Sequence, residues 1–328
     1  MSETKFPRVM VSSVIRTANA GQSHGGLYIV DLEDGSFEQV INWDDTNISF
    51  RDRGAERGLR GLALYGEHIY VTSCDSLMVY DRQFNKLEEY ANPYLFDCHE
   101  TWVEGNFLYV TSTFYDSVLV FDLEKKRFTD GYCFRNDFDR VIKKAMWKVF
   151  GMQRAPGLRA VRFDPNSGGG PRMDDVLHLN SIYVADGVLY LSSYRTKSLY
   201  AFRDGRLEVV SPLPEKTHNA RRFRDGVLFA NTGDDEAIYS AMDGAVRHRY
   251  PAVKLSDEEL KFADLPDHIA RTGFVRGLTV FDDRYVIFGV SPAMILVYDI
   301  ETAELVKTVV LSRDVRNAVH GVEIFPDL

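Results

Sequence analysis

Four of the eight histidines lie at the start of segments that read as β-strands, each a few residues ahead of a turn. In two further segments of this kind an arginine occupies that position. These residues are His99, His178, His218, His320, Arg60 and Arg276. Neutral imidazole is the commonest protein ligand for zinc, iron and copper, and the guanidinium fork fits carboxylate or phosphate. If the six segments converge, they form either a metal centre or an anion site.

Neighbours of these residues are further candidates. Asn180 and Asn219 belong to the similar triplets HLN and THN, and we expect both to contact a substrate. Glu100 follows His99 directly and is the candidate general base, or a partner that orients an imidazole. Alternation along a strand would point Glu100 away from the face of His99. Cys98 could be a nucleophile or a small buried residue.

The predicted chemistry has two forms. Three or four histidines with an open coordination position could hold a divalent iron or zinc ion that activates oxygen or water, while Arg60 and Arg276 bind an anionic substrate. No carboxylate occupies the matched position in the six segments, so the same residues could bind phosphate, sulfate or a carboxylate without a metal. Any single histidine could also be structural. The sequence leaves these alternatives open.

The segments that carry these residues belong to a repeat. Two strand-like runs around a short turn recur five times and are each followed by a third and a fourth run. The paired runs cover residues 60–74, 99–113, 181–194, 220–233 and 276–290. Four antiparallel strands in about 40 residues are the size of a propeller blade. The innermost strand of each blade begins near the axis, so its first residues meet those of the other blades.

The two ends of the chain complement each other. The N-terminal part supplies a second, third and fourth strand, in RVMVSSV, HGGLYIVDLEDG and SFEQVINW, and the C-terminal HGVEIFPDL supplies a first strand. Pairing them would close the ring and remove exposed edges. We therefore predict an all-β fold, a six-bladed β-propeller that forms a single domain over residues 1–328. A β-sandwich or two smaller β domains are the alternatives.

Two insertions interrupt the repeat, at residues 137–176 and 253–274. The first has an apolar stripe at helical spacing with Asp137 at the cap position, and in the second Ser256 and Glu259 have capping-box spacing. Both join the fourth strand of one blade to the first strand of the next. We predict two short helices over the channel mouth.

Composition limits the partners and the compartment. The 39 lysines and arginines against 48 aspartates and glutamates give a formal charge of −9, which argues against nucleic acid or an anionic membrane as partner. Three cysteines without CxxC spacing, no apolar leader and no long apolar run favour a cytoplasmic protein without a membrane span. The expected partner is a small anionic molecule, and assembly into a homo-oligomer stays open.

Several motifs resemble those of a largely uncharacterised family of bacterial propellers, which carry HLNG, a PHSPR-like motif before a DGxLW strand, and RGLAF. The counterparts are HLNS (178–181), THNAR (217–221) followed by DGVLFANTG, and RGLTVFDDRYVIFGVS (276–291), in matching order within residues 99–291. The resemblance implies the fold and a recurrent histidine pattern, but no activity. The architecture is more loosely similar to gluconolactonase-like and virginiamycin B lyase-like propellers, which use a divalent metal at the channel mouth. Iron oxygenases of the carotenoid-cleavage type also place four histidines at a propeller axis.

The leading hypothesis is a metal-dependent enzyme that acts on a small anionic substrate in the central channel, by lyase or hydrolase chemistry ahead of oxygenation. The alternative is a non-catalytic propeller that binds a protein partner or an anionic metabolite. Propellers serve both roles, so the fold alone does not choose between them.

Overall fold

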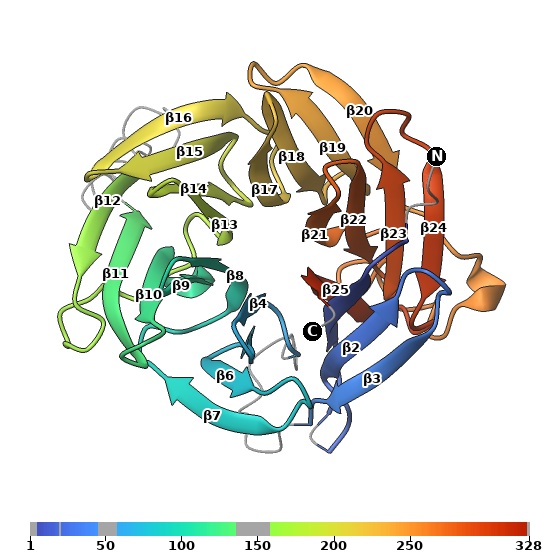
Figure 1. The fold of residues 1–328 in the computed structure, drawn as a ribbon, viewed down its shortest axis with the longest axis horizontal. Coiled ribbons are helices and arrows are strands. Elements are labelled where there is room, and N and C mark those ends of the chain that lie inside the picture. The colour runs from blue at the N-terminus through green and yellow to red at the C-terminus, as the bar shows by residue number, and fades with distance from the viewer. Residues whose placement is uncertain (1–4, 20, 45–57, 136–157, 327–328) are drawn as a thin grey trace.

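The computed structural model describes residues 5–19, 21–44, 58–135 and 158–326. In these residues the chain forms six antiparallel sheets arranged around a common axis (Figure 1). The predicted all-β, six-bladed propeller is confirmed. None of the described segments forms a helix of the length and apolarity that a membrane crossing requires.

The sheets are numbered as blades in ring order, and each is given from its inner to its outer strand. Blade 1 holds β25 (Asn317–Phe325), β1 (Arg8–Ile15), β2 (Gly25–Asp31) and β3 (Phe37–Asn42). Blade 2 holds β4 (Leu62–Tyr65), β5 (His68–Thr72), β6 (Ser76–Tyr80) and β7 (Lys86–Ala91). Blade 3 holds β8 (Cys98–Glu104), β9 (Phe107–Ser112), β10 (Ser117–Asp122), β11 (Arg127–Arg135) and β12 (Leu158–Phe163), with the 3₁₀ turn η1 (Thr113–Tyr115) between β9 and β10.

The other three blades follow the same order. Blade 4 holds β13 (Leu179–Ala185), β14 (Val188–Ser193), β15 (Ser198–Arg203) and β16 (Arg206–Pro212). Blade 5 holds β17 (Thr217–Phe223), β18 (Gly226–Asn231), β19 (Glu236–Ala241) and β20 (Val246–Pro251). Blade 6 holds β21 (Arg276–Phe281), β22 (Tyr285–Val290), β23 (Met294–Asp299) and β24 (Leu305–Val310).

Burial explains which residues form which strand. Third strands such as β10 and β23 are buried along their whole length because each lies between two neighbouring blades. Outer strands such as β7, with the sequence KLEEYA, are mostly exposed. A strand buried on both faces needs a continuous apolar run, whereas an outer strand tolerates charge. The core is therefore a set of apolar layers between adjacent blades.

The ring closes through the two ends of the chain, as the sequence predicts. Strand β25 pairs with β1 in antiparallel register, from Arg8 opposite Phe325 to Ile15 opposite Asn317. In Figure 1 β25 lies beside β1 and β2 and faces the centre together with β4, β8, β13, β17 and β21. The closure gives every inner strand a neighbour on both sides and places His320 in the ring.

Five of the six inner strands are irregular near their starts. The pairing register shifts after Cys98, Leu179, His218 and Arg276, and in blade 1 opposite the Ser12–Ser13 step. A bulge inserts an unpaired residue and turns neighbouring side chains toward one face, so it breaks strict alternation. The residues at the bulges include most of the predicted site residues.

Three glycines allow inner strands to touch at these irregular starts. A Cβ on Gly61 would lie 2.9 Å from the amide nitrogen of Thr101, and one on Gly321 would lie 2.5 Å from the carbonyl oxygen of Arg60. A Cβ on Gly277 would lie 3.0 Å from the backbone of Gly321. These glycines therefore bring the inner strands of blades 6, 1, 2 and 3 into backbone contact.

The helical insertions are only partly as expected. The predicted helix that begins near Asp137 falls in residues 136–157, outside the described residues, and the rest of that insertion supplies β12, a fifth strand on blade 3. The helix predicted in residues 253–274 is wrong, because the segment contains only the single 3₁₀ turn η2 (Asp257–Glu259). The Ser256–Glu259 capping box does form. Lys261 then pairs with residues 313–315, through its N–H to Arg313 and its carbonyl to Val315, and this extended pairing ends the helical turn.

The contact at Gly321 makes a stability prediction. Gly321→Ala should lower the free energy of unfolding by about 2 to 3 kcal/mol, because the added methyl group overlaps the backbone of Arg60. Gly168→Ala is the matched control, since a Cβ there meets nothing within 4 Å. Urea unfolding of both variants checks this. Equal stability of the two variants would contradict a closely packed ring of inner strands.

Candidate metal centre

The structure brings the four predicted histidines together. The ring centre of His99 lies 5.2 Å from that of His178, 6.2 Å from that of His218 and 6.0 Å from that of His320. A metal ion about 2.1 Å from an imidazole nitrogen lies about 3.2 Å from the ring centre, so two rings that share it have centres roughly 5 to 6.5 Å apart. The spacing of the rings around His99 therefore fits a shared ion.

The orientation of His99 is fixed by hydrogen bonds. Its Nδ1 lies 2.8 Å from the carbonyl oxygen of Asp97 and 2.9 Å from Oγ1 of Thr113. The Thr113 hydroxyl itself donates to the carbonyl of Leu179, at 2.6 Å. A carbonyl only accepts, so Nδ1 carries the proton and Nε2 keeps its lone pair. The ring thus offers Nε2 as a ligand.

His218 has the same arrangement two blades further on. Its Nδ1 lies 3.3 Å from the carbonyl oxygen of Lys216 and 2.9 Å from Oγ1 of Thr232, and Thr232 donates to the carbonyl of Val275 at 2.7 Å. Nε2 of His218 is buried and has no hydrogen-bond partner in the part of the chain that the structure describes. A buried acceptor without a partner is costly, which favours a ligand at this atom.

The imidazoles are held in the neutral form that metal ligation needs. Burial, followed by the charge of nearby arginines, lowers the pKa of His99, His218 and His320 well below the usual value. Neutral rings keep a free lone pair at neutral pH, whereas imidazolium cannot ligate. Burial also raises the pKa of the Cys98 thiol well above its usual range, which disfavours a nucleophilic role for this residue.

One candidate ligand was missed by the sequence interpretation. Asp97, His99 and His178 each offer a ligand atom, and these atoms lie within 4.8 Å of one another. Asp97 precedes the strand in a left-handed turn, with φ at 56°, so strand periodicity does not predict its position. Its carboxylate also pairs with the buried guanidinium of Arg60. The site therefore contains a carboxylate, in contrast to the expectation from the aligned strand starts.

His178 is positioned by two aspartates. Its Nδ1 lies 3.0 Å from a carboxylate oxygen of Asp175, and its backbone N–H donates to Asp116 at 3.0 Å. Asp116 also accepts the N–H groups of Val176 and Leu177 and is buried beside Arg135. Asp116 therefore holds the segment that leads into β13 and sets where His178 enters the ring.

The two predicted arginines lie in the site but contact it differently. Arg60 is 1% exposed and donates to Asp97 and to the carbonyl of Cys98. Nη1 of Arg276 lies 2.8 Å from Nε2 of His320. Because a guanidinium only donates, this Nε2 is the acceptor and is already engaged. His320 therefore presents no free Nε2 in this arrangement.

A cationic cluster around Phe274 adjoins the histidines and was also missed. The guanidinium carbons of Arg16, Arg271 and Arg276 lie 4.9, 5.0 and 4.4 Å from the centre of the Phe274 ring. Arg271 is paired with Asp235, whereas Arg16 and Arg276 both depress the pKa of His320. Phe274 lies in the predicted insertion and Arg16 follows β1, so neither belongs to the repeat.

Glu100 and Asn219 form a chain of hydrogen bonds across the ring. The Glu100 carboxylate accepts from Nδ2 of Asn219 at 2.8 Å and from the N–H of Ile182 at 2.9 Å. Oδ1 of Asn219 then accepts from the N–H of Gly277 at 2.8 Å. We call these residues, Glu100, Ile182, Asn219 and Gly277, the cross-blade belt. It connects blades 3, 4, 5 and 6.

Asn180 has a different environment from Asn219. It is 1% exposed, and neither atom of its amide has a hydrogen-bond partner among the described residues. The residue sits at the bulge of β13, immediately after the carbonyl of Leu179 that accepts from Thr113. An amide buried without partners is expensive, so a polar ligand or an ordered water is expected next to it.

No family model matches the chain, and no curated protein matches it either. A chain of the nidogen/laminin complex matches with a TM-score of 0.56 at 10% identity, over 96% of this chain and 97% of that one. A protein of unknown function from Bacteroides caccae matches with a TM-score of 0.55 at 10% identity, over 96% and 98%. Virginiamycin B lyase from Staphylococcus aureus gives only 0.45 at 9% identity, over 78% and 71%. The first two matches, which cover nearly the whole chain, agree with the propeller fold that the motif resemblance implies. At 10% identity they indicate the fold and no activity.

The threonine contacts predict a tautomer and its dependence on each hydroxyl. In the native protein His99 and His218 should both carry the proton on Nδ1. The nearest backbone carbonyl oxygen lies 3.3 Å from Nδ1 of His218 but 2.8 Å from Nδ1 of His99. Thr232→Val should therefore shift His218 toward the other tautomer more than Thr113→Val shifts His99. Nitrogen chemical shifts of ¹⁵N-histidine-labelled protein measure this, with the threonine-to-serine variants as controls. An Nε2-protonated ring in the native protein would contradict the assignment.

A second prediction concerns Glu323 on β25. Burial raises the pKa of its carboxyl to about 7 from 4.5, with the charge of Glu100 acting in the same direction and Arg221 opposing it. Because the folded-state value is the higher one, the stabilising contribution is complete below about pH 4.5 and is lost as the pH rises through about 7.

Glu323→Gln should therefore reduce the loss of unfolding free energy between pH 5 and pH 8 by on the order of 2 kcal/mol. The exposed Glu258→Gln serves as control. Chemical unfolding at several pH values gives the comparison. Parallel pH profiles for the native protein and Glu323→Gln would rule out a raised pKa.

Proposed function

We propose that the protein is a metal-dependent enzyme that acts on a small anionic substrate at the start of the inner strands. The metal ligands in this proposal are His99, His178, His218 and Asp97. The observation that carries the proposal is the protonation and orientation of His99 and His218. Two neutral rings have their Nδ1 protons fixed by equivalent threonines, and one of the remaining Nε2 atoms is buried without a partner.

The donor set indicates the type of metal. Imidazole nitrogens with one carboxylate suit zinc or iron. Three of these four ligands would leave a position open on a tetrahedral zinc ion, and all four would leave one on an iron ion of higher coordination number. When bound, such an ion would polarise a substrate oxygen or lower the pKa of a water molecule. The chain's own contribution is to hold His99 and His218 neutral and oriented, and to supply Asp97 from the turn before β8.

The arginines would bind the substrate's anionic group. Arg276 lies beside His320 and over Phe274, and Arg16 lies over the same ring, so two guanidinium groups lie close to the histidines. The charge of Arg60 is balanced by Asp97. Asn180 is the remaining candidate for substrate binding, because its buried amide has no partner among the described residues, whereas Asn219 is part of the cross-blade belt.

The state of His320 bears on the reaction type. Its Nε2 accepts from Arg276, so a site with four equivalent histidines is not assembled here. Three histidines and a carboxylate resemble a Lewis-acid or hydrolytic site more than a four-histidine oxygen-activating one. This favours lyase or hydrolase chemistry over oxygenation. Glu100 is less suited to act as a base, since its carboxylate already accepts from Asn219 and Ile182.

A metal-free anion site is the second candidate function, and the contact between Arg276 and His320 favours it. Arg16, Arg276 and a neutral His320 form a cationic surface next to an aromatic ring, which could bind phosphate or a carboxylate directly. In that form the protein would be a binding propeller, and the four histidines would be hydrogen-bonding residues of the pocket.

Elemental analysis of protein purified without a histidine tag separates the two functions. We expect close to one equivalent of zinc or iron per chain, reduced at least tenfold by His99→Ala and by His178→Ala. His248→Ala, on the outer strand β20, is the matched control and should keep the metal. Protein that stays metal-free after incubation with zinc and iron, but is thermally stabilised by phosphate in an Arg276-dependent way, would overturn the metal proposal in favour of the anion site.

A further inference from the structure

The inner strands present a second group of chemically active residues at their other ends. Trp102, Tyr183, Phe223 and Val280 lie toward the ends of β8, β13, β17 and β21, whereas the histidines lie at the beginnings. Trp102 follows His99 by three positions along β8, a rise of at most about 10 Å. The cross-blade belt lies between the two levels. The two mouths of the channel therefore have separate sets of side chains.

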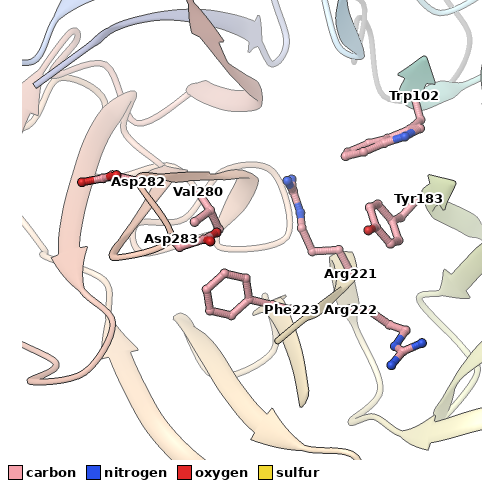
Figure 2. Close-up of a pocket in the computed structure, with 8 residues that line it drawn as sticks. All are labelled: Trp102, Tyr183, Arg221, Arg222, Phe223, Val280, Asp282 and Asp283. Carbon is pink, nitrogen blue, oxygen red and sulfur yellow. The ribbon is translucent and has the colours of Figure 1, made fainter. Parts of the chain in front are cut away.

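A hollow of about 530 Å³ opens among these strand ends, and Figure 2 shows its lining. The lining residues are Trp102, Tyr183, Arg221, Arg222, Phe223, Val280, Asp282 and Asp283. They come from blades 3, 4, 5 and 6. A volume of this size admits one or two six-membered rings.

Aromatic side chains make one wall of the hollow. Trp102 and Tyr183 meet edge to face with ring centres 4.7 Å apart, and both are partly exposed. The Arg221 guanidinium lies 5.4 Å from the Trp102 ring centre, and in Figure 2 it extends between this wall and Phe223. The indole N–H of Trp102 is buried and has no hydrogen-bond partner among the described residues. An aromatic face and an N–H group without a partner among the described residues therefore lie next to each other.

Opposite charges balance across the hollow. Arg221 extends toward the middle of the hollow and donates to the carbonyl of Leu278, whereas Arg222 points away and contacts Tyr190 (Figure 2). Asp282 and Asp283 form the turn between β21 and β22 and have φ values of 53° and 48°. In Figure 2 the Asp282 carboxylate points out of the hollow, which leaves Asp283 as the acidic side chain at its edge. The corresponding turn of blade 4 has Gly187, which adopts this conformation without strain. One cation, Arg221, and one anion, Asp283, therefore bear on the hollow, so a strongly charged ligand would meet repulsion as well as attraction.

The ligand that fits this chemistry is uncharged and rich in hydroxyl groups. A sugar hydroxyl can donate to a carboxylate and accept from a guanidinium at once, and the C–H face of a pyranose packs on an aromatic ring. We propose that the mouth of the channel lined by Trp102, Tyr183, Arg221 and Asp283 binds a neutral saccharide of one or two rings. This site is distinct from the candidate metal centre, and the proposal does not depend on a metal.

Saturation-transfer NMR and calorimetry with methyl β-D-glucopyranoside, cellobiose and maltose test the proposal, with sodium benzoate and L-phenylalanine as charged aromatic probes. At least one saccharide should bind, with affinity reduced tenfold or more by Asp283→Gly, a change that suits the positive φ and removes the carboxylate. Tyr183→Ala should weaken binding similarly. Asp186→Gly, in the corresponding turn of blade 4 outside the lining, should leave it unchanged.

Three results would overturn the proposal. They are the absence of saccharide binding to the native protein, binding that survives both Asp283→Gly and Tyr183→Ala, and preferential binding of benzoate or phenylalanine. Metal content measured in the same samples keeps the two sites apart. We expect Asp283→Gly to keep the native metal content whatever that is, so loss of the metal proposal and loss of the saccharide proposal are separately visible.

Discussion

The fold depends on how closely six strand starts approach one axis. In one half of the ring the contact is backbone against backbone and is made possible by Gly61, Gly277 and Gly321. In the other half side chains bridge the gap, with Glu100 and Asn219 linking four blades. Both kinds of contact occur where the regular hydrogen bonding between paired strands is interrupted. The histidines stand on these interrupted starts, so the geometry of the candidate site follows from the way the ring is closed.

Much of the fold could be predicted from the sequence because each blade repeats the same order of strand-like runs and turns. Buried third strands such as β23 read as continuous apolar runs, and the matching halves at the two chain ends indicate closure. The insertion at residues 253–274 shows the limit of local reasoning. A true capping box at Ser256 starts a helical turn, but pairing of Lys261 with residues 313–315 stops it, and that partner is distant in sequence.

The candidate site was predictable only where it follows the repeat. His99 and His320 share one position relative to the turn, and His218 and His178 lie two and three residues further upstream, so aligning the blades finds all four near the strand starts. The structure brings them together. Asp97 lies in a left-handed turn, Thr113 and Thr232 lie at the ends of second strands, and Arg16 lies beyond β1. Thr113 and Thr232 each follow their histidine by 14 residues, and this shared spacing is a signal that could have found them. Arg16 contacts Phe274 from a distant part of the chain, which no spacing predicts. The bulge in β8 also breaks the strict alternation of side chains, on which the expectation that Glu100 points away from the face of His99 was based.

The pairing of β25 with β1 also has a consequence for biosynthesis. During synthesis β1 is made before the other strands, and its inner partner β25 is made only after every other blade. His320, which contacts Arg276 and lies beside His99, arrives with that last strand. A nascent chain that stalls or is cleaved before β25 has an open ring and an incomplete site at the same time. The ring and the group of four histidines are therefore completed by the same strand.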